Sequence, residues 1–446
     1  MRVTTRLATS ARVGTAVVLA LAAWYAAPGA TGAQEPAASP RSAAAPSPLA
    51  TLRRGRDGFI GVRDFSAALP PAQTIVDSQS EQREPEYPAD LAALGLIQGE
   101  LRETEKGATH LLDAIAIIAA AEGEYSPTLI DYYHGLGRTY IRGAQYEKAI
   151  ATLEEAQHLS QRNLGLFNVE QSAVLDDITT AYLGLGNTVE AQKLQVERLE
   201  NAVRRFGAAD PRVIPFRYTL GKYYERSRLP ESAREQYTEV LKAQETRLGG
   251  NDAGLLAPLR ELVSIDLLIA QSNDAAQRDR LAAVLEQSTT ADPVERGLSL
   301  AVLGDWATVA GDASTAREYY RQSWEALGNS PGIDVAREFS RPVMIDFIAP
   351  LSPVDRAERS RPYTWAPIVI EFDVSAEGLP SDVHIVTRDQ QTVTLQTRYS
   401  RRVRETHFRP RLVDGQPVPT TNVRSTHYVR RYVNRDEEEQ EDEEAG

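Results

Sequence analysis

The chain has 446 residues, a length that accommodates two or three domains. Hydrophobic residues make up 42% and charged residues 25% of the sequence, so most of the chain can bury a core. Cysteine is absent, which excludes disulfides, thiolate catalysis and sulfur-ligated metals, and the formal charge of −13 gives no support to nucleic-acid binding.

The N-terminus has the features of an export signal. Its positive region carries Arg2, Arg6 and Arg12. The run 13–27 is uncharged and mostly apolar but shorter than the roughly 20 residues that span a bilayer as a helix, and small residues at 31–33 offer a cleavage site. We therefore predict a signal peptide at 1–33 and a mature protein in the periplasm. The alternative is an uncleaved inner-membrane anchor, which would be the chain's membrane contact.

The next segment, 34–87, is rich in Ala, Pro and Ser and lacks helical periodicity. Such a composition is typical of an extended, disordered linker. For the apolar residues at 59–62, the alternative is a short strand that pairs with another part of the chain.

A sequence repeat begins near residue 88. Large and small residues occur at fixed spacing in the set Tyr133, Leu136, Gly137, Tyr140, Ala149, Leu153 and Ala156. Related residues return 84 positions later, which is two periods of 42, at Leu220, Gly221, Tyr224, Ala233 and Tyr237. A further copy contains Leu303, Gly304, Ala307, Ala316 and Tyr320. This spacing resembles the tetratricopeptide repeat, in which helical hairpins stack because none can bury its apolar face alone.

The resemblance implies five or six hairpins over 88–327, with Gly137, Gly221 and Ala149 where two helices approach closely. It also implies that two positions of each first helix point into a groove that could hold a peptide. In this chain the groove candidates are His134, Arg138, Asp176, Thr180, Tyr218 and Lys222. The alternative is that these side chains belong to an ordinary solvated surface.

Prolines interrupt the chain after residue 327. They are Pro331, Pro342, Pro350, Pro353 and Pro362. Their spacing predicts a Pro-rich linker at 328–362. Within it, the apolar run at 342–347 could form a strand that docks on a neighbouring element.

From 363 to 434 the hydrophobic period changes to two. Alternating apolar residues predict strands at about 368–374, 383–387 and 420–433, with a helix before the last strand. Four motifs follow one another: Phe372-Asp373-Val374, Glu377-Gly378, Phe408-Arg409-Pro410 and Asp414-Gly415-Gln416-Pro417-Val418. In this order they resemble the C-terminal domain of TonB energy-transducer proteins. We therefore predict a tetratricopeptide-like helical solenoid with a 42-residue period, joined to a small α+β domain with a three-stranded antiparallel sheet and one helix.

The TonB resemblance implies a free edge on the last strand, where a peptide from an outer-membrane transporter adds as a further strand. The matching positions include Val423, Arg424, Ser425, His427 and Val429. The chain departs from the family in its short N-terminal apolar run without His and in the repeat array that replaces the usual spacer. These departures favour a passive role over energy transduction.

The sequence predicts no enzymatic activity, cofactor or metal site. Its six histidines lack the spacing that brings two metal ligands together, and it has no nucleophile elbow, phosphate loop or dinucleotide fingerprint. The basic run at 398–404 and the acidic tail at 435–446 are typical of solvated surfaces. Alternatively, the tail folds back on the basic run and blocks the binding edge.

These features predict a periplasmic scaffold for protein–protein interactions. Its repeats are expected to bind a protein partner, and its terminal module a peptide by strand addition. The expected partners are envelope proteins or peptides, outer-membrane transporters among them, and not nucleic acid. The alternative is an atypical TonB-like energy transducer for outer-membrane transport.

Overall fold

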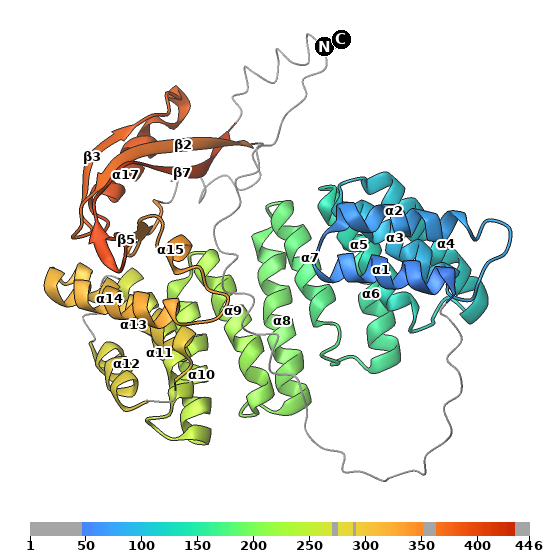
Figure 1. Cartoon of the computed structure of the whole chain (residues 1–446), viewed down its shortest axis with the longest axis horizontal. Helices are drawn as coiled ribbons and strands as arrows, with labels where there is room; N and C mark the ends of the chain where they lie inside the picture. The colour runs from blue at the N-terminus through green and yellow to red at the C-terminus, as the bar shows by residue number, and fades with distance from the viewer. Residues whose placement is uncertain (1–46, 270–274, 289–290, 351–362, 433–446) are drawn as a thin grey trace. The chain divides into compact units, whose positions relative to one another are not determined.

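The computed structural model describes residues 47–269, 275–288, 291–350 and 363–432 (Figure 1). The described ranges are helical as far as residue 338, and from residue 343 they contain strands together with one further α-helix. The expected signal peptide at 1–33 and the acidic tail at 435–446 lie outside the described residues. Within the described ranges, no helix has both the length and the apolarity that crossing a membrane requires.

The prediction of a disordered linker at 34–87 is wrong for much of that segment. Helix α1 (Pro48–Gly61) and helix α2 (Phe65–Asp77) lie within it, and the proposed strand at 59–62 falls largely in α1. Residues 34–46 lie outside the described part of the chain. The chain therefore adds two helices before the first predicted repeat.

Tertiary packing explains why this Ala- and Pro-rich segment is helical. Ala68 and Ala72 of α2 are fully buried and pack with Leu91 and Leu94 of α3 (Tyr87–Glu100). Small side chains allow this close approach, and burial of an apolar face stabilises a helix more than its intrinsic propensity does. Composition alone does not reveal such a partner surface.

A buried charge network joins α1 to α3. The carboxylate of Asp90, which is 1% exposed, accepts hydrogen bonds from Arg53 Nη2 at 2.6 Å, Arg56 Nη1 at 2.8 Å and Gln79 Nε2 at 2.9 Å. Burial alone would raise the pKa of Asp90, but these three donors outweigh it and lower the pKa below its usual value. The carboxylate is therefore held in its charged form.

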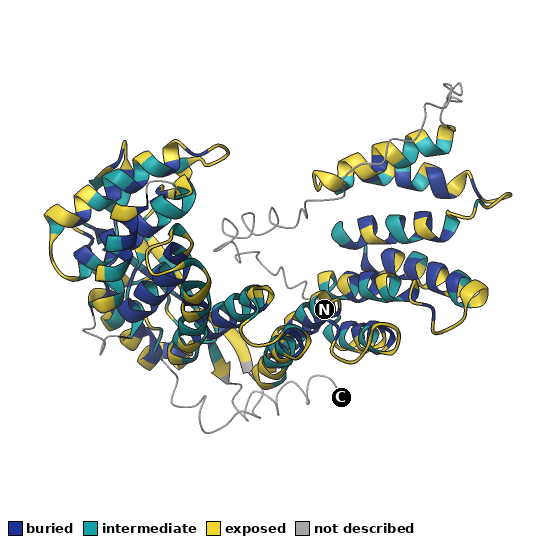
Figure 2. Ribbon diagram, turned by 90° about the horizontal axis from the view of Figure 1, so that it is seen from below, coloured by how far each residue is buried: buried dark blue, intermediate teal, exposed yellow. Residues whose placement is uncertain are grey.

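The predicted helical repeat is confirmed. Six hairpins follow one another in the described chain: α3 with α4 (Thr104–Glu122), α5 (Leu129–Arg142) with α6 (Tyr146–Leu164), α7 (Ser172–Gly184) with α8 (Thr188–Phe206), α9 (Ile214–Arg226) with α10 (Pro230–Leu248), α11 (Leu256–Leu268) with α12 (Ala276–Gln287), and α13 (Pro293–Val309) with α14 (Ala313–Gly328). Short 3-10 turns, η2 (Pro211–Val213) and η3 (Ala253–Leu255), precede α9 and α11. Successive first helices begin 42, 43, 42, 42 and 37 residues apart. Figure 2 shows the helices with a buried side and an exposed side, as stacked hairpins require.

Glycines mark the closest approach of the two helices in a hairpin, as predicted. A Cβ atom at Gly221 would lie 2.6 Å from the ring of Tyr237, and one at Gly304 would lie 2.5 Å from the ring of Tyr320. A Cβ at Gly137 would overlap Leu153 in the same way. Because no real Cβ makes such contacts, the large residue on the second helix requires glycine on the first.

The predicted linker at 328–362 contains helix α15 (Val335–Glu338) and strand β1 (Val343–Met344). Strand β1 pairs antiparallel with β4 (Phe408–Arg409), so the predicted docking of the 342–347 run is confirmed. Residues 351–362 lie outside the described chain.

The C-terminal module is the predicted small α+β fold. A three-stranded antiparallel sheet has the order β3 (Pro380–Ile385), β2 (Tyr363–Val374) and β7 (Thr420–Tyr432). The remaining elements are the turn η4 (Gln390–Thr392), helix α17 (Val393–Arg404) and the hairpin of β5 (Arg411–Val413) and β6 (Gln416–Val418). The core joins inward-facing Ile368, Ile370 and Phe372 of β2 to Tyr399 and Val403 of α17. The alternating apolar residues of β2 thus lie on one face of the sheet, and helix α17 covers that face.

An ion pair connects this module to the last hairpin. Arg409 Nε and Nη2 donate to the two carboxylate oxygens of Asp305 on α13 at 2.8 and 2.5 Å. Tyr320 of α14 also donates to Asp305, at 3.0 Å. The N–H of Leu412 donates to the carbonyl of Phe339 at 3.1 Å, and Leu412 is buried. The last repeat therefore buries its outer side against the C-terminal module.

Candidate protein-binding surfaces

The groove candidates on α5 contact the hairpins on either side. His134 Nε2 lies 2.7 Å from Asp177 Oδ2 on α7, and Arg138 Nη2 donates to Glu100 of α3 at 3.2 Å. Arg142 also pairs with Glu100, at 3.0 Å. These predicted binding residues therefore link successive first helices by polar side-chain contacts.

The candidates on α9 behave similarly. Lys222 Nζ donates to Glu261 of α11 at 2.5 Å and to Glu225 at 3.2 Å. Burial raises the pKa of Tyr218, and its hydroxyl has no hydrogen-bond partner among the described residues. The ring of Tyr218 lies 5.8 Å from that of Tyr237, centroid to centroid. Tyr218 therefore belongs to the packing between helices more than to an open surface.

The acidic partners of these residues were missed by sequence reasoning. The paired positions are separated by 38 residues for Arg138 and Glu100, 43 for His134 and Asp177, and 39 for Lys222 and Glu261. Each separation is close to one repeat period. An acidic residue about 42 residues from a basic residue or a histidine is the signal that could have revealed these contacts.

The other candidate positions lie on β7 and alternate between its two faces. Val423, Ser425, His427 and Val429 face α17, whereas Arg424 lies on the opposite face. His427 stacks on Phe347 with ring centroids 5.0 Å apart. Burial, together with the positive charge of Arg228, lowers the pKa of His427 to about 4. These inward side chains build the module's core, so a ligand would reach β7 through its main chain.

The hydrogen bonds of β2 show which way the main chain of β7 points. The N–H of Val369 donates to Thr387 Oγ1 at 2.7 Å, and its carbonyl accepts from the N–H of Val386 at 2.9 Å. The carbonyl of Pro367 accepts from Thr387 Oγ1 at 3.2 Å. The main-chain groups of both β2 residues thus point toward the β3 side, away from β7.

Thr426 lies opposite Val369, and Tyr428 lies opposite Pro367. In an antiparallel sheet, if the N–H and C=O groups of one residue point away from the neighbouring strand, those of the residue directly opposite also point away. The N–H and C=O groups of Thr426 and Tyr428 therefore project from the outer edge of β7. In the described chain no strand pairs with that edge.

The solvent face beside this edge carries aromatic and basic side chains. Trp365 is 57% exposed and Tyr428 is 46% exposed. The Arg430 guanidinium lies 5.9 Å from the centroid of the Trp365 ring, and Arg424 Nε donates to Glu371. Trp, Tyr and Arg are the residues most enriched at binding hot spots.

The basic run on α17 is partly structural. Arg402 Nη2 donates to the carbonyl of Asp346 at 2.6 Å, and Arg404 Nη2 donates to that of Val383 at 2.8 Å. These two arginines tie the helix to neighbouring segments. The tail at 435–446 lies outside the described residues, so the alternative in which it folds back on this run is not tested.

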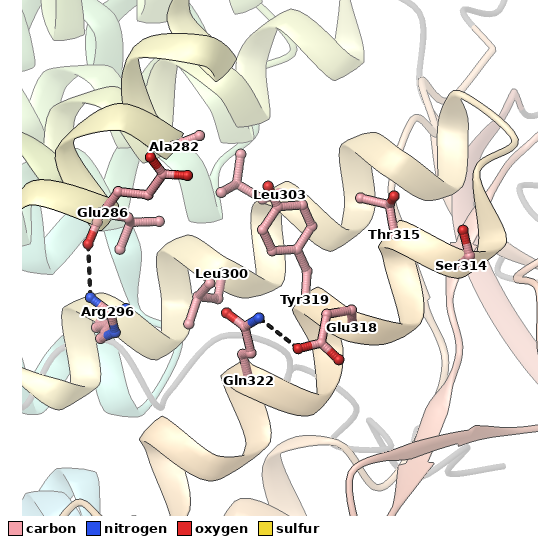
Figure 3. Close-up of a pocket in the computed structure, with 11 residues that line it drawn as sticks. Ala282, Glu286, Arg296, Leu300, Leu303, Ser314, Thr315, Glu318, Tyr319 and Gln322 are labelled. Carbon is pink, nitrogen blue, oxygen red and sulfur yellow. Dashed lines mark hydrogen bonds between the residues drawn. The ribbon is translucent and has the colours of Figure 1, made fainter.

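A separate pocket lies between α12 and α14. Its volume is about 520 Å³. The second helices α4, α6, α8 and α10 each have 19 residues, whereas α12 has 12. In Figure 3, Leu300, Leu303 and Tyr319 lie between Glu286 and Glu318. The short α12 thus lies beside an open surface on the last hairpins.

No group of three or more His, Asp or Glu residues in the described chain is arranged to hold a metal ion. The pocket of Figure 3 joins one arginine and two glutamates to polar and apolar side chains. Arg296 Nη1 donates to the carbonyl of Leu285 at 2.9 Å, and Gln322 donates to Glu318 at 2.7 Å. Such a set of charged, polar and apolar side chains can bind a peptide.

No protein-family model and no curated protein matches the chain. Similar solved structures include the C-terminal part of a TPR repeat-containing protein from Cytophaga hutchinsonii, with 11% identity, coverage of 63% of this chain and 96% of that chain, and a TM-score of 0.41. A tetratricopeptide repeat protein from Parabacteroides merdae has 13% identity, coverage of 65% and 96%, and a TM-score of 0.35. A putative kinesin light chain with TPR-like repeats from Podosopora anserina has 17% identity, coverage of 45% and 96%, and a TM-score of 0.39.

Proposed function

We propose that this chain is a periplasmic scaffold without catalytic activity, which binds an extended peptide by strand addition at β7 and a protein partner on its repeats. One observation carries the proposal. Thr426 projects its main-chain donor and acceptor from an edge of β7 that pairs with no strand in the described chain. Such edges are templates for β-augmentation, in which main-chain hydrogen bonds supply affinity and flanking side chains supply specificity.

The repeats support the second half of the proposal. Hairpins at a 42-residue step present equivalent positions along one array, which is how solenoids build extended binding surfaces. The surface between α12 and α14 combines apolar Leu300 and Leu303 with a polar rim. The periplasmic location is supported by the basic, then apolar, then small residues at 1–33.

Strand addition is tested with two variants of one residue. Peptides of about nine residues displayed on phage are selected against the full chain. Thr426→Pro removes an outward N–H without removing a bond to β2, because proline is tolerated on an edge whose N–H faces solvent. Thr426→Ala keeps that N–H and removes only the side-chain hydroxyl and methyl groups.

We expect selected peptides to bind Thr426→Pro about tenfold more weakly or worse, since a hydrogen bond is lost and the ring obstructs the added strand. Binding to Thr426→Ala should be close to that of the original chain. Unchanged melting temperatures show that both variants fold. Peptides that bind all three proteins equally would rule out strand addition at this edge.

An atypical TonB-like energy transducer is the second candidate. It is favoured by the order of elements in the module: strand, turn, strand, helix, Phe-Arg-Pro segment and final strand. Sequencing the N-terminus of the protein from cells separates the candidates. A start at Gln34 in the periplasmic fraction supports the scaffold, whereas an intact N-terminus in the membrane fraction supports the transducer.

A further inference from the structure

The cavity between α12 and α14 opens onto the edge of a hydrophobic core. Leu285, Leu300 and Leu303 line the cavity and belong to the buried core of the last hairpins. Ala282 and Tyr319 also line it, and both are half-buried against that same core. An apolar side chain inserted here would therefore extend an existing core, and its burial would favour binding.

Small side chains leave this space open. Ser314 and Thr315 of α14 line one side of the cavity, and Ala282 of α12 lines the other. In Figure 3, Leu303 and Tyr319 lie between these two sides. The volume of about 520 Å³ falls within the range of roughly 300–1,000 Å³ that is typical of ligand pockets. The cavity therefore has room for one large apolar side chain.

Glu286 places a carboxylate without a partner at the rim of this apolar floor. Its side chain is exposed and forms no hydrogen bond or ion pair within the described chain. The arginine that lines the cavity, Arg296, donates instead to the main-chain carbonyl of Leu285 at 2.9 Å. The second carboxylate of the lining, that of Glu318, already pairs with Arg321 at 2.6 Å. Glu286 is thus the lining group that can receive a cation from a ligand.

We propose that this cavity receives a segment of a partner protein that inserts one large apolar side chain and places a lysine or arginine nearby, against Glu286. The inference rests on the proposed binding of a protein partner on the repeats, and it names the chemistry of that partner. In Figure 3 the carboxylate of Glu286 and the ring of Tyr319 border the same space, so an anchor on Tyr319 brings a neighbouring cation within reach of Glu286. The apolar anchor should supply most of the affinity, because exposed ion pairs contribute little.

The probes are linear 12-residue peptides displayed on phage and selected against the full chain carrying Thr426→Pro. This substitution removes an outward N–H of β7 and obstructs an added strand, so selection favours peptides that bind elsewhere. Selected peptides are synthesised with a fluorescent label, and anisotropy measures their affinity. We expect them to share a large apolar residue with a Lys or Arg within about four positions, the spacing that keeps two side chains on one face.

Two pairs of matched variants locate the binding site. Thr315→Trp fills the cavity from its α14 side and should weaken binding at least about tenfold, whereas Thr246→Trp adds the same ring at an exposed position of α10 and should leave binding unchanged. Glu286→Gln should weaken binding by about 1.5- to 5-fold, and less at high salt. Glu154→Gln removes the same charge from an exposed position of α6 and should have no effect.

Two further measurements keep the test independent of folding. Melting temperatures show whether each variant folds. Alanine in place of the apolar residue of the peptide should also weaken binding at least about tenfold, and this change leaves the protein intact.

The outcomes separate this inference from the two halves of the proposed function. Peptides that bind all four variants equally would overturn the cavity as the site, while binding on another face of the chain would stand. Loss of binding in Thr315→Trp without any effect of Glu286→Gln, or selection of acidic peptides, would overturn the basic partner. Peptides that are selected by the original chain but never by Thr426→Pro would overturn this inference and leave strand addition standing.

Discussion

At the residue scale, a buried ion pair fixes the C-terminal module to the repeat array. Asp305 follows Gly304 as Arg138 follows Gly137 and Lys222 follows Gly221, so it occupies an equivalent repeat position. Arg138 and Lys222 donate hydrogen bonds to residues of another hairpin, whereas Asp305 accepts hydrogen bonds from Arg409 of the C-terminal module. Arg409, the middle residue of the Phe-Arg-Pro segment, thus supplies to the last hairpin the kind of contact that earlier hairpins receive from a neighbouring repeat.

Breaking this ion pair should destabilise the protein. Arg409→Met leaves the carboxylate of Asp305, which is 9% exposed, without its main partner. We expect a loss of about 3–5 kcal/mol in the free energy of unfolding, measured by urea denaturation. The double variant Asp305→Leu with Arg409→Met should recover part of the loss. A single variant as stable as the original chain would show that the pair is not needed.

The glycines of the repeat give a second prediction. Gly304→Ala forces a Cβ against the ring of Tyr320 and should cost about 1–3 kcal/mol. Gly58 in helix α1 has no atom within 4 Å of its would-be Cβ, so Gly58→Ala should stabilise the helix by up to about 1 kcal/mol. Opposite shifts of the two melting temperatures are the expected result. Equal shifts would contradict the packing described.

His427 predicts a pH dependence of stability. Its folded pKa of about 4 lies below the ordinary value of 6.5, so the unfolded chain binds the proton first as pH falls. Stability contributed by the neutral ring is complete above pH 6.5 and is lost toward pH 4, by roughly 3 kcal/mol in total. His427→Phe keeps the ring beside Phe347 but cannot titrate. Urea denaturation between pH 7 and 4 should show the smaller loss in the variant, and identical losses would exclude this role.

Residue-level prediction from sequence succeeded for packing and failed for charge pairing. Gly137, Gly221 and Ala149 could be placed because the repeat requires small residues at fixed positions. His134 and Lys222 could be placed on first helices, but their contacts depend on the neighbouring hairpin. The sequence of one helix does not show which polar residue of the neighbouring hairpin will contact it.

At the element scale, the N-terminal helices α1 and α2 show the limit of composition. Their Ala and Pro content is typical of a linker, yet Asp64 caps α2 by accepting from the N–H of Ala67 at 3.0 Å. An aspartate before an apolar, Ala-rich run is a recognised start signal. The strands of the C-terminal module were easier to predict because alternation of apolar residues is itself a local signal.

The attachment of α1 can be tested through its buried charge. Asp90→Ala leaves Arg53 and Arg56 without their shared acceptor and should cost about 3–5 kcal/mol, with α1 becoming sensitive to trypsin. Asp57, which is exposed and pairs with Arg56, is the control. Asp57→Ala should cost less than about 1 kcal/mol. Equal trypsin resistance of the two variants would show that α1 is held by other contacts.

At the scale of the whole molecule, the chain combines a stacked helical array with an open sheet edge. Its fold class followed from two periods in the sequence, 42 residues in the repeats and two residues in the strands. The outward direction of the main-chain groups of Thr426 and Tyr428 could not be predicted from these periods. It depends on which N–H and C=O groups of β2 point toward β3. Main-chain direction is set by pairing between distant segments.

Amide hydrogen exchange of β7 tests strand addition most directly. The full chain is compared alone and with a phage-selected peptide. The outward N–H group of Thr426 should exchange rapidly in the free protein and slow by at least about tenfold when the peptide binds. Those of Ser425 and His427, which face β2, should be slow in both states. If the peptide binds while Thr426 keeps its rapid exchange, the edge of β7 is not where it binds.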